Sequence, residues 1–399
     1  MRTFAPALMV WPLWAYSLLS QGIVGEVFAQ YWPMSVAMLL GSFVAGSTPL
    51  GGGIVAYPVC QLVLFWPTPD SRDASILVQS IGMNAAGYLL LLRKRHLLHY
   101  SMIFTFTVWG GVGILLGLMV ASPSDVLPTE WRKGTLPPGL ANIIFGTLVL
   151  CFAIMYCYVS ELLPKHTEPH RRQDGSICAK DPHAVVKLTT HACDADSIYF
   201  KELDDTSPVP SVTGVGERLL DWLPLHAAMI VFALCGGFLT ANVGSGSDMA
   251  LYIFGVFVWN PARPLEAQTE TALTASSVVV MGILSAVASV ARAVNGGFAR
   301  KILLCWGADA FIVVLGAPIG AYVLTPSAAV CLRRLFYIMA LVQFVNFTFM
   351  EDAFFDATVA PYVGKRVWLV IGPLLLGEFA MLAWHYNHFH RVRAPYDLI

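Results

Sequence analysis

The chain has 399 residues, of which 57% are hydrophobic and only 12% are charged, and its mean hydropathy is +0.66. This composition excludes an ordinary soluble globular protein and predicts an all-α polytopic membrane protein whose main surroundings are the lipid bilayer. The formal net charge of −1 gives no broad basic or acidic surface, so nucleic acid is not expected as a partner.

Apolar runs of about the length that spans a bilayer, roughly 20 residues, recur along the whole chain. In chain order they are Phe4 to Val27, Met34 to Phe65, Ala74 to Leu92, Met102 to Ala121, Gly139 to Ser160, Leu223 to Val258, Ala267 to Ala291, Ile302 to Leu324, Leu335 to Met350 and Val367 to Trp384. The first run contains Pro12 and is followed by a Val-Phe-Ala sequence that resembles a small-residue cleavage site. It is therefore either a transmembrane helix or a signal peptide.

A long polar stretch rich in His, Asp, Lys and Pro separates two apolar halves, and we interpret it as a flexible linker. Its Cys and His residues lack the close spacing of a metal site, so neither a metal nor a cofactor is predicted. The predicted organisation is an N-terminal hydrophobic segment over residues 1–32, a first transmembrane repeat over 33–160, the linker over 161–222, a second repeat over 223–350, and a final transmembrane helix with a polar tail over 351–399.

The two halves carry similar glycine-rich sequences in the same order. "GSFVAGSTPLGGGIVAY" (Gly41 to Tyr57) aligns without a gap with "GGFLTANVGSGSDMALY" (Gly236 to Tyr252). Further on, "GILLG" (Gly113 to Gly117) corresponds to "GAPIG" (Gly316 to Gly320), which we interpret as faces where helices cross closely. The sequence therefore predicts two homologous repeats of about four transmembrane helices, each with one broken glycine-rich helix, plus extra terminal helices.

A helix break inside the hydrocarbon survives only where it is buried in protein or lines a wet cavity, so each break marks a cavity. Where a helix restarts, free N–H groups and the positive end of the helix dipole favour an anion, and glycine permits close approach. Neutral hydroxyls and an amide would add hydrogen-bond donors. We therefore predict that the two breaks face each other and bind a small anion through Ser47, Thr48, Gly51, Gly52, Gly53, Asn242, Gly244, Ser245, Gly246 and Ser247.

Two acidic residues, Asp248 and Asp309, lie well inside apolar runs, where a carboxylate is costly and often serves ion or proton coupling. We predict ion coupling, by a proton or sodium, at both. The alternative is structural: each acid caps a half-helix or pairs with a nearby arginine such as Arg292 or Arg300.

Polar side chains also recur at helical spacing in the third apolar run, at Ser75, Gln79, Ser80 and Asn84. The corresponding run of the second half carries Glu270, Thr271, Thr274, Ser276 and Ser277. They face either the cavity or a neighbouring helix, to which they would hydrogen-bond.

The order of these motifs, a G-x-x-x-G helix followed by "LGGG", a helix opening with Ala-Ser, and "GSGSD" in the second half, resembles the sulfite exporter TauE/SafE family. The similarity covers about Gly41 to Leu324. It implies a multi-pass transporter of sulfite or small organosulfonate anions. The second half departs from the glycine triplet, with Ser247 and Asp248 where the first half has Gly52 and Gly53, which argues against symmetric anion binding.

We therefore expect a multi-pass protein of the plasma membrane or an intracellular membrane that exports sulfur oxyanions by alternating access, and not an enzyme. Within transport the alternative is an anion channel or a sodium-coupled carrier. The alternative from another functional class is a membrane scaffold or receptor that retains a transporter fold. A transporter predicts that changes at Gly52 or Asp248 abolish flux, whereas a scaffold predicts that deleting Pro182 to Asp205 removes function.

Overall fold

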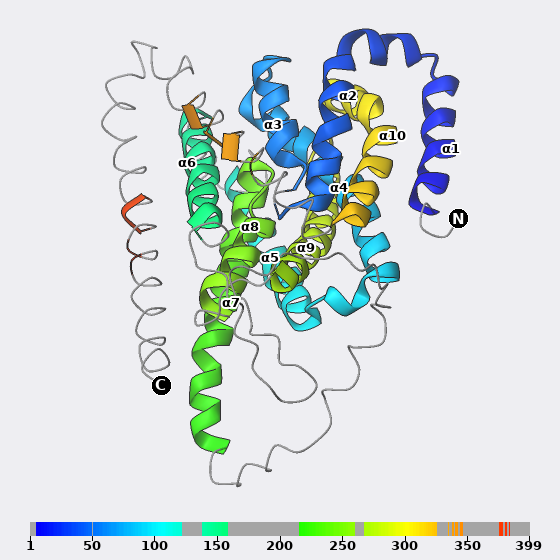
Figure 1. Cartoon of the computed structure of the whole chain (residues 1–399). Helices are drawn as coiled ribbons and strands as arrows, with labels where there is room; N and C mark the ends of the chain where they lie inside the picture. The colour runs from blue at the N-terminus through cyan, green and yellow to red at the C-terminus, as the bar shows by residue number, and fades with distance from the viewer. Residues whose placement is uncertain are drawn as a thin grey trace, which may run out of the picture. The chain divides into compact units, whose positions relative to one another are not determined.

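The computed structural model of the chain describes residues 5–49, 51–121, 138–158, 215–259 and 267–324, together with scattered residues of 334–383. These residues are helical, and no strand occurs among them. Figure 1 shows the helices, which are α1 (Ala5–Ser20), α2 (Val24–Ser47), α3 (Gly53–Leu62), α4 (Thr68–Arg93), η2 (Arg95–Leu97), α5 (Tyr100–Ala121), α6 (Pro138–Cys157), α7 (Val215–Val243), α8 (Ser247–Ile253), η6 (Phe254–Trp259), α9 (Ala267–Val294) and α10 (Arg300–Val323).

Six of the described helices, namely α2, α4, α5, α7, α9 and α10, contain stretches long and apolar enough to cross a membrane. The prediction of an all-α, multi-pass integral membrane protein is therefore confirmed. The homology of the two halves stays a prediction. The predicted segments Leu335 to Met350 and Val367 to Trp384, the polar tail and the linker up to residue 214 fall wholly or largely outside the described residues.

Three predicted boundaries differ from the structure. The first apolar run is two helices, because α1 ends at Ser20 and α2 begins at Val24, with Gly22 between them at a φ of 65°. α7 begins at Val215, inside the predicted linker. α4 begins at Thr68 rather than at Ala74, since Pro69 in its first turn has the φ of a helix and Asp70 complements the helix dipole.

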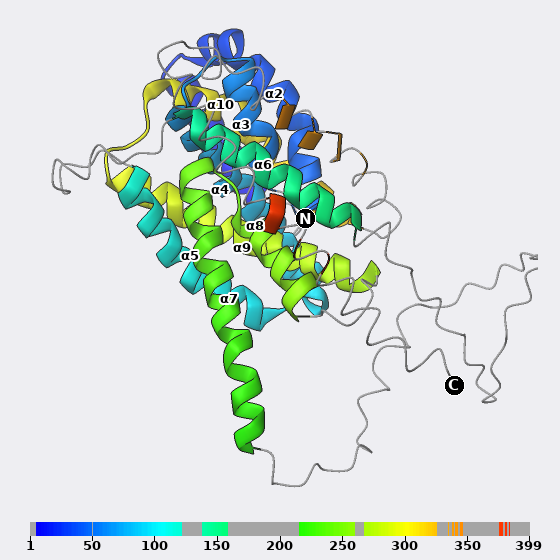
Figure 2. The ribbon, with the colours of Figure 1, turned by 90° about the vertical axis from the view of Figure 1, so that its left-hand side faces the viewer.

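The interior of the described helices is built around α4 and α9, which pack along each other (Figure 2). α10 also packs on α4 and α2, and α5 packs on α9. Asn84 of α4 joins the central pair, because its Nδ2 donates to the carbonyl oxygen of Gly282 at 2.8 Å. Asn84 therefore hydrogen-bonds to a neighbouring helix. Of the two roles that the sequence allows, facing the cavity or bonding to a helix, the structure shows the second at this position.

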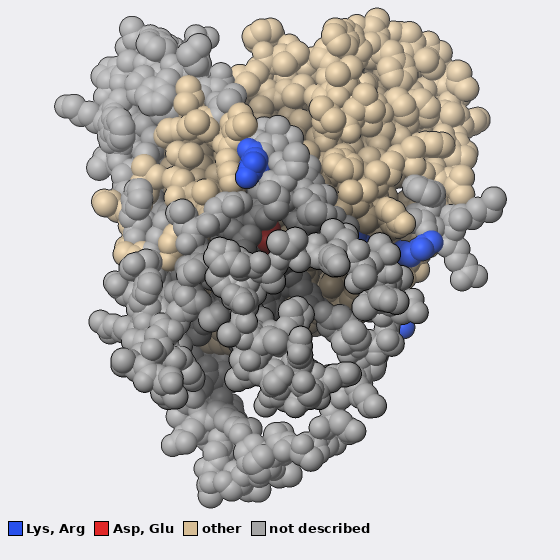
Figure 3. Space-filling model, viewed as in Figure 1, with Lys and Arg blue, Asp and Glu red and all other residues tan. Residues whose placement is uncertain are grey.

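Large apolar side chains cover much of the outside of these helices. Leu13 and Tyr16 on α1, Leu40 on α2 and Phe104 on α5 each expose more than two thirds of their surface. On the face seen in Figure 3, the region of α1, α2 and α10 shows no Lys, Arg, Asp or Glu. Such a surface is stable against lipid hydrocarbon and is unsuited to water.

Glycines allow the helices to cross with their backbones in contact, in a reciprocal arrangement. On α10, a Cβ atom at Gly320 would overlap the carbonyl of Phe43 on α2. On α5, a Cβ atom at Gly117 would lie 2.9 Å from the carbonyl oxygen of Phe238 on α7. The glycine helix of each half thus packs against the broken helix of the other half, which confirms the interpretation of both G-x-x-x-G motifs as close helix crossings.

The connection between α4 and α5 is held by two basic residues. The ammonium group of Lys94 donates to the carbonyl oxygens of Ala321, Tyr322 and Leu324 at 3.0 to 3.1 Å, where it satisfies the carboxyl-terminal end of α10. The backbone N–H of His99 donates to Ser276 Oγ at 3.0 Å, and partial burial lowers the pKa of the His99 imidazole.

The lowered pKa of His99 predicts a pH dependence of stability. Unfolded, the imidazole titrates near its ordinary pKa of about 6.5, whereas in the folded protein it protonates only at lower pH. The free energy of unfolding therefore falls as pH is lowered from about 6.5 toward the pKa of the folded protein. We expect His99→Gln to weaken this pH dependence in thermal unfolding in detergent, and His96→Gln, at an exposed site, to leave it unchanged. Equal pH dependence in all three proteins would contradict the assignment to His99.

Candidate functional site

Two helix interruptions form the centre of the described structure, as the sequence predicts. α2 ends at Ser47 and the chain restarts as α3 at Gly53, while α7 ends at Val243 and α8 begins at Ser247. Gly51, Gly244 and Gly246 have φ values of 60°, 80° and 149°. Residues with a Cβ atom rarely adopt such backbone conformations, so glycine is needed at these three positions.

The two breaks face each other across α4. The side chain of Gln79 donates through Nε2 to the carbonyl oxygen of Gly244 at 2.5 Å and to Ser75 Oγ at 3.0 Å. From the other break, a Cβ atom on Gly53 would lie 2.6 Å from Gln79 Nε2, 2.7 Å from Ser75 Oγ and 2.9 Å from the Gly244 carbonyl oxygen. The prediction that the breaks meet is therefore confirmed, and Ser75 and Gln79 join them.

At the second break, the backbone amides point at a carboxylate of the chain itself. Asp248 Oδ1 accepts from the N–H of Gly246 at 3.3 Å and from the N–H of Met249 at 3.0 Å, with Ser245 Oγ at 3.5 Å. The N–H of Ser247 donates to Thr240 Oγ1 at 3.0 Å. An acid in the first turn of a helix satisfies amides that otherwise lack partners, so Asp248 has the capping role that the sequence offered as an alternative.

The predicted neutral donors are also engaged within their own helices in this conformation. Ser47 Oγ donates to the carbonyl oxygen of Phe43, and Thr48 Oγ1 to that of Val44, both at 2.8 Å. Asn242 Nδ2 donates to the carbonyl oxygen of Phe238, also at 2.8 Å. An anion would therefore gain these donors only after a local rearrangement.

Asp309 lies apart from the contacts that join the breaks. It is fully buried on α10, next to Ala308 of the hydrophobic cluster that also holds Cys305 and Cys60, and neither carboxyl oxygen has a hydrogen-bond partner. The predicted arginine partners are wrong, because Arg292 pairs with Asp73 at 2.8 Å and Arg300 pairs with Glu26 at 3.2 Å. Arg292 does not pair with Asp309 because its guanidinium group contacts Asp73, near the start of α4.

The comparison with protein families supplies the family of the chain. The sequence model of the sulfite exporter TauE/SafE family matches residues 34–347. The chain belongs to this family. Neither the comparison with curated proteins nor the comparison with solved structures finds a match.

Membership assigns this TauE/SafE protein to the membrane exporters of sulfite and related sulfur anions, which are transporters and not enzymes. The match includes both helix breaks and both G-x-x-x-G helices. Among the residues that the structure describes, no three His, Cys, Asp or Glu side chains are grouped so that they could hold a metal ion.

A buried cluster of charges near the second break was not foreseen. The guanidinium of Arg72 lies 2.8 Å from Asp73 Oδ1, and Arg292 of α9 lies 2.8 Å from the other carboxylate oxygen. Arg72 is only 4% exposed, and its backbone carbonyl lies near Gly244. The two guanidinium groups thus share one carboxylate beside the second break, so positively charged side chains lie close to it.

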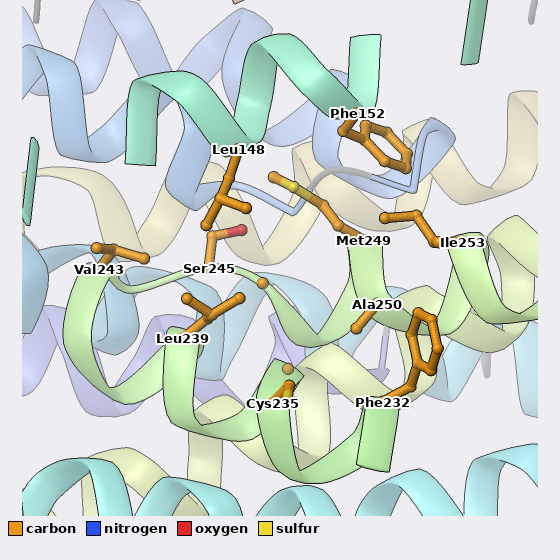
Figure 4. Close-up of a pocket in the computed structure, with 12 residues that line it drawn as sticks. Leu148, Phe152, Phe232, Cys235, Leu239, Val243, Ser245, Met249, Ala250 and Ile253 are labelled. Atoms are coloured by element: carbon orange, nitrogen blue, oxygen red, sulfur yellow. The ribbon is translucent and has the colours of Figure 1, made fainter. Parts of the chain in front are cut away.

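A cavity of about 170 Å³ adjoins the second break in this TauE/SafE protein. Its walls are mostly apolar and come from α6, α7 and α8, with Ser245 and Gly246 of the break in the lining. Figure 4 shows the hydroxyl of Ser245 between Leu148 of α6 and Leu239 of α7. The cavity therefore places one hydroxyl and one glycine of the break beside an otherwise hydrophobic space.

Proposed function

We propose that the protein exports sulfite or a small sulfonate by alternating access, with the anion bound at the facing breaks and its movement coupled to a proton. Family membership supports the class of substrate. The contact between Gly53 and the Gly244 carbonyl supports the place of the site, since it is where the two halves meet. Relative movement of the halves would open this point to either side of the membrane in turn.

A single observation carries the proposal: the amides of Gly246 and Met249 already hold an oxyanion, the carboxylate of Asp248. A sulfite or sulfonate group has the same charged oxygens and competes for these donors. Protonation of Asp248 removes its negative charge, weakens it as an acceptor and reduces its repulsion of the substrate. Proton binding and anion binding therefore favour each other.

The charge cluster of Arg72, Asp73 and Arg292 supports an anionic substrate. Its guanidinium charges are fixed on α4 and α9, and the carbonyl of Arg72 lies next to Gly244. In a low-dielectric interior, such a charge attracts an anion over several ångströms. It would raise the local concentration of the substrate without a direct contact at the break.

Proteoliposomes loaded with sulfite test this function. We expect protein-dependent efflux that is faster when the interior is more acidic than the exterior. Asp248→Asn should lose this dependence on the pH gradient, while Asp309→Asn, a matched change at the other buried acid, should keep it. The absence of efflux from folded protein would reject the substrate class. Gradient-independent efflux would reject proton coupling, and loss of coupling only in Asp309→Asn would move it to that residue.

A further inference from the structure

Two buried oxygen atoms without hydrogen-bond partners point toward the same glycine. They are Oδ2 of Asp248 and Oε1 of Gln79, on side chains that are 0% and 1% exposed. A Cβ atom on Gly51 would lie 2.6 Å from the first and 2.7 Å from the second. The absent side chain of Gly51 thus leaves the space in which these two acceptors converge.

The orientation of the Gln79 amide is fixed by its own contacts. Its Nε2 donates to the carbonyl oxygen of Gly244 at 2.5 Å, to Ser75 Oγ at 3.0 Å and to the carbonyl oxygen of Ser75 at 3.2 Å. The two carbonyl oxygens can only accept hydrogen bonds, so the NH₂ group has to face them. Oε1 is consequently directed to the opposite side, toward Gly51 and Asp248.

Two acceptors cannot satisfy each other, and each buried acceptor without a donor destabilises the protein by about 1–3 kcal/mol. One proton would satisfy both acceptors, because a protonated carboxyl group donates a hydrogen bond through its O–H and the amide oxygen accepts it. A metal cation is a poorer fit, since hard cations take roughly six or more oxygen ligands and only these two side-chain oxygens converge here among the described residues.

We propose that Asp248 and Gln79 form one proton-binding site that spans the two halves, with the proton on Asp248 Oδ2 and hydrogen-bonded to Gln79 Oε1. This deepens the proposed function and rests on it for its role in transport. Gln79 is a positioning residue. Because its amide is also anchored on Gly244, gain or loss of the proton acts directly on the contact between the breaks.

The charged groups of the surrounding helices are engaged elsewhere. α4 carries Asp70, which pairs with Lys301, and Asp73, which pairs with Arg72 and with Arg292 of α9. The one acid of α9, Glu270, accepts from the hydroxyl of Tyr156 of α6 at 2.6 Å. α3, α5 and η6 contain no charged residue, and Arg93 ends α4. Among the α7 residues whose side chains the structure describes, the one that can carry a charge is His226. Asp248 is thus the acid in position to receive the proton at this site.

Infrared difference spectroscopy of the purified full-length protein, titrated with acid in the absence of sulfite, tests this site. The band of interest is the part of the carboxylic acid C=O stretch that disappears in Asp248→Asn. We expect Gln79→Leu to shift this band to higher frequency, because the carboxyl O–H loses its acceptor. Gln61→Leu on α3, whose amide donates to Tyr57 instead, should leave the band unchanged.

An Asp248 band that does not shift in Gln79→Leu would overturn the proposal. So would a titration midpoint that moves with sodium concentration, because the site would then bind a metal cation. If Gln79→Leu does not fold, Ser75→Ala removes one acceptor that orients the amide and should shift the band partway. The infrared titration contains no substrate, so its outcome does not depend on transport. Absence of sulfite efflux would therefore reject the proposed function, while the proton site would still be decided by the infrared band.

Discussion

Gly53→Ala is expected to reduce sulfite efflux by at least an order of magnitude, whereas Gly52→Ala should keep it near the wild-type rate. A Cβ atom on Gly53 would enter the contact of Gln79, Ser75 and the Gly244 carbonyl, with all three atoms closer than 3.0 Å. Such crowding costs about 1–3 kcal/mol and would separate the breaks. At Gly52 the nearest atoms lie 3.5 to 3.7 Å away, which is ordinary contact.

The two substitutions make a matched pair, because they add the same methyl group to adjacent residues at the start of α3. Initial efflux rates, normalised to the amount of folded protein in the vesicles, compare them. The sequence alone predicts that a change at Gly52 abolishes flux, and the structure replaces this with Gly53. Equal activity of the two variants would contradict a substrate path that depends on the contact between the breaks.

The second large effect is expected on stability, at Gly113 of α5. A Cβ atom there would overlap the carbonyl of Leu234 on α7, so Gly113→Ala forces the two helices apart. We expect unfolding to be easier by about 1–3 kcal/mol, as for other overpacked cores. Gly111 lies on the same helix with no atom within 4 Å of its Cβ position, and Gly111→Ala should stabilise by about 0.5–1 kcal/mol through helix propensity.

Thermal unfolding of both variants in the same detergent compares them with the wild-type protein. The opposite signs are informative, because helix propensity alone would make both variants more stable. A Gly113→Ala protein as stable as Gly111→Ala would mean that α5 and α7 do not cross with their backbones in contact. The reciprocal packing of α10 on α2 would then lack its counterpart in the first half.

The breaks and the helix crossings could be predicted from the sequence because glycine patterns report directly on backbone geometry. Gly51, Gly244 and Gly246 stand where positive φ values occur, and Gly113 and Gly320 stand where helices touch. The partners of these glycines were not predictable. Each contacts a backbone carbonyl or a side chain of a distant segment, and a backbone carbonyl leaves no mark on the sequence.

The same limit applies to the partners of the polar residues on α4. Ser75 and Gln79 lie one helical turn apart, which identified a polar face on α4, but Gln79 bonds to the backbone of a residue 165 positions away. The predicted start of the third segment at Ala74 leaves Arg72 outside it, whereas Pro69 favours a helix start before Arg72. The extra turn buries Arg72 beside Asp73 and near the second break.

The account depends most on one claim, that the substrate oxyanion takes the place of the Asp248 carboxylate at the amides of the second break. Calorimetric binding of methanesulfonate, whose charge does not change over the accessible pH range, tests it without interference from the titration of sulfite. We predict that wild-type affinity rises as pH falls, and that Asp248→Asn binds tightly with no dependence on pH. Wild-type affinity that is independent of pH, or loss of binding in folded Asp248→Asn, would contradict the claim.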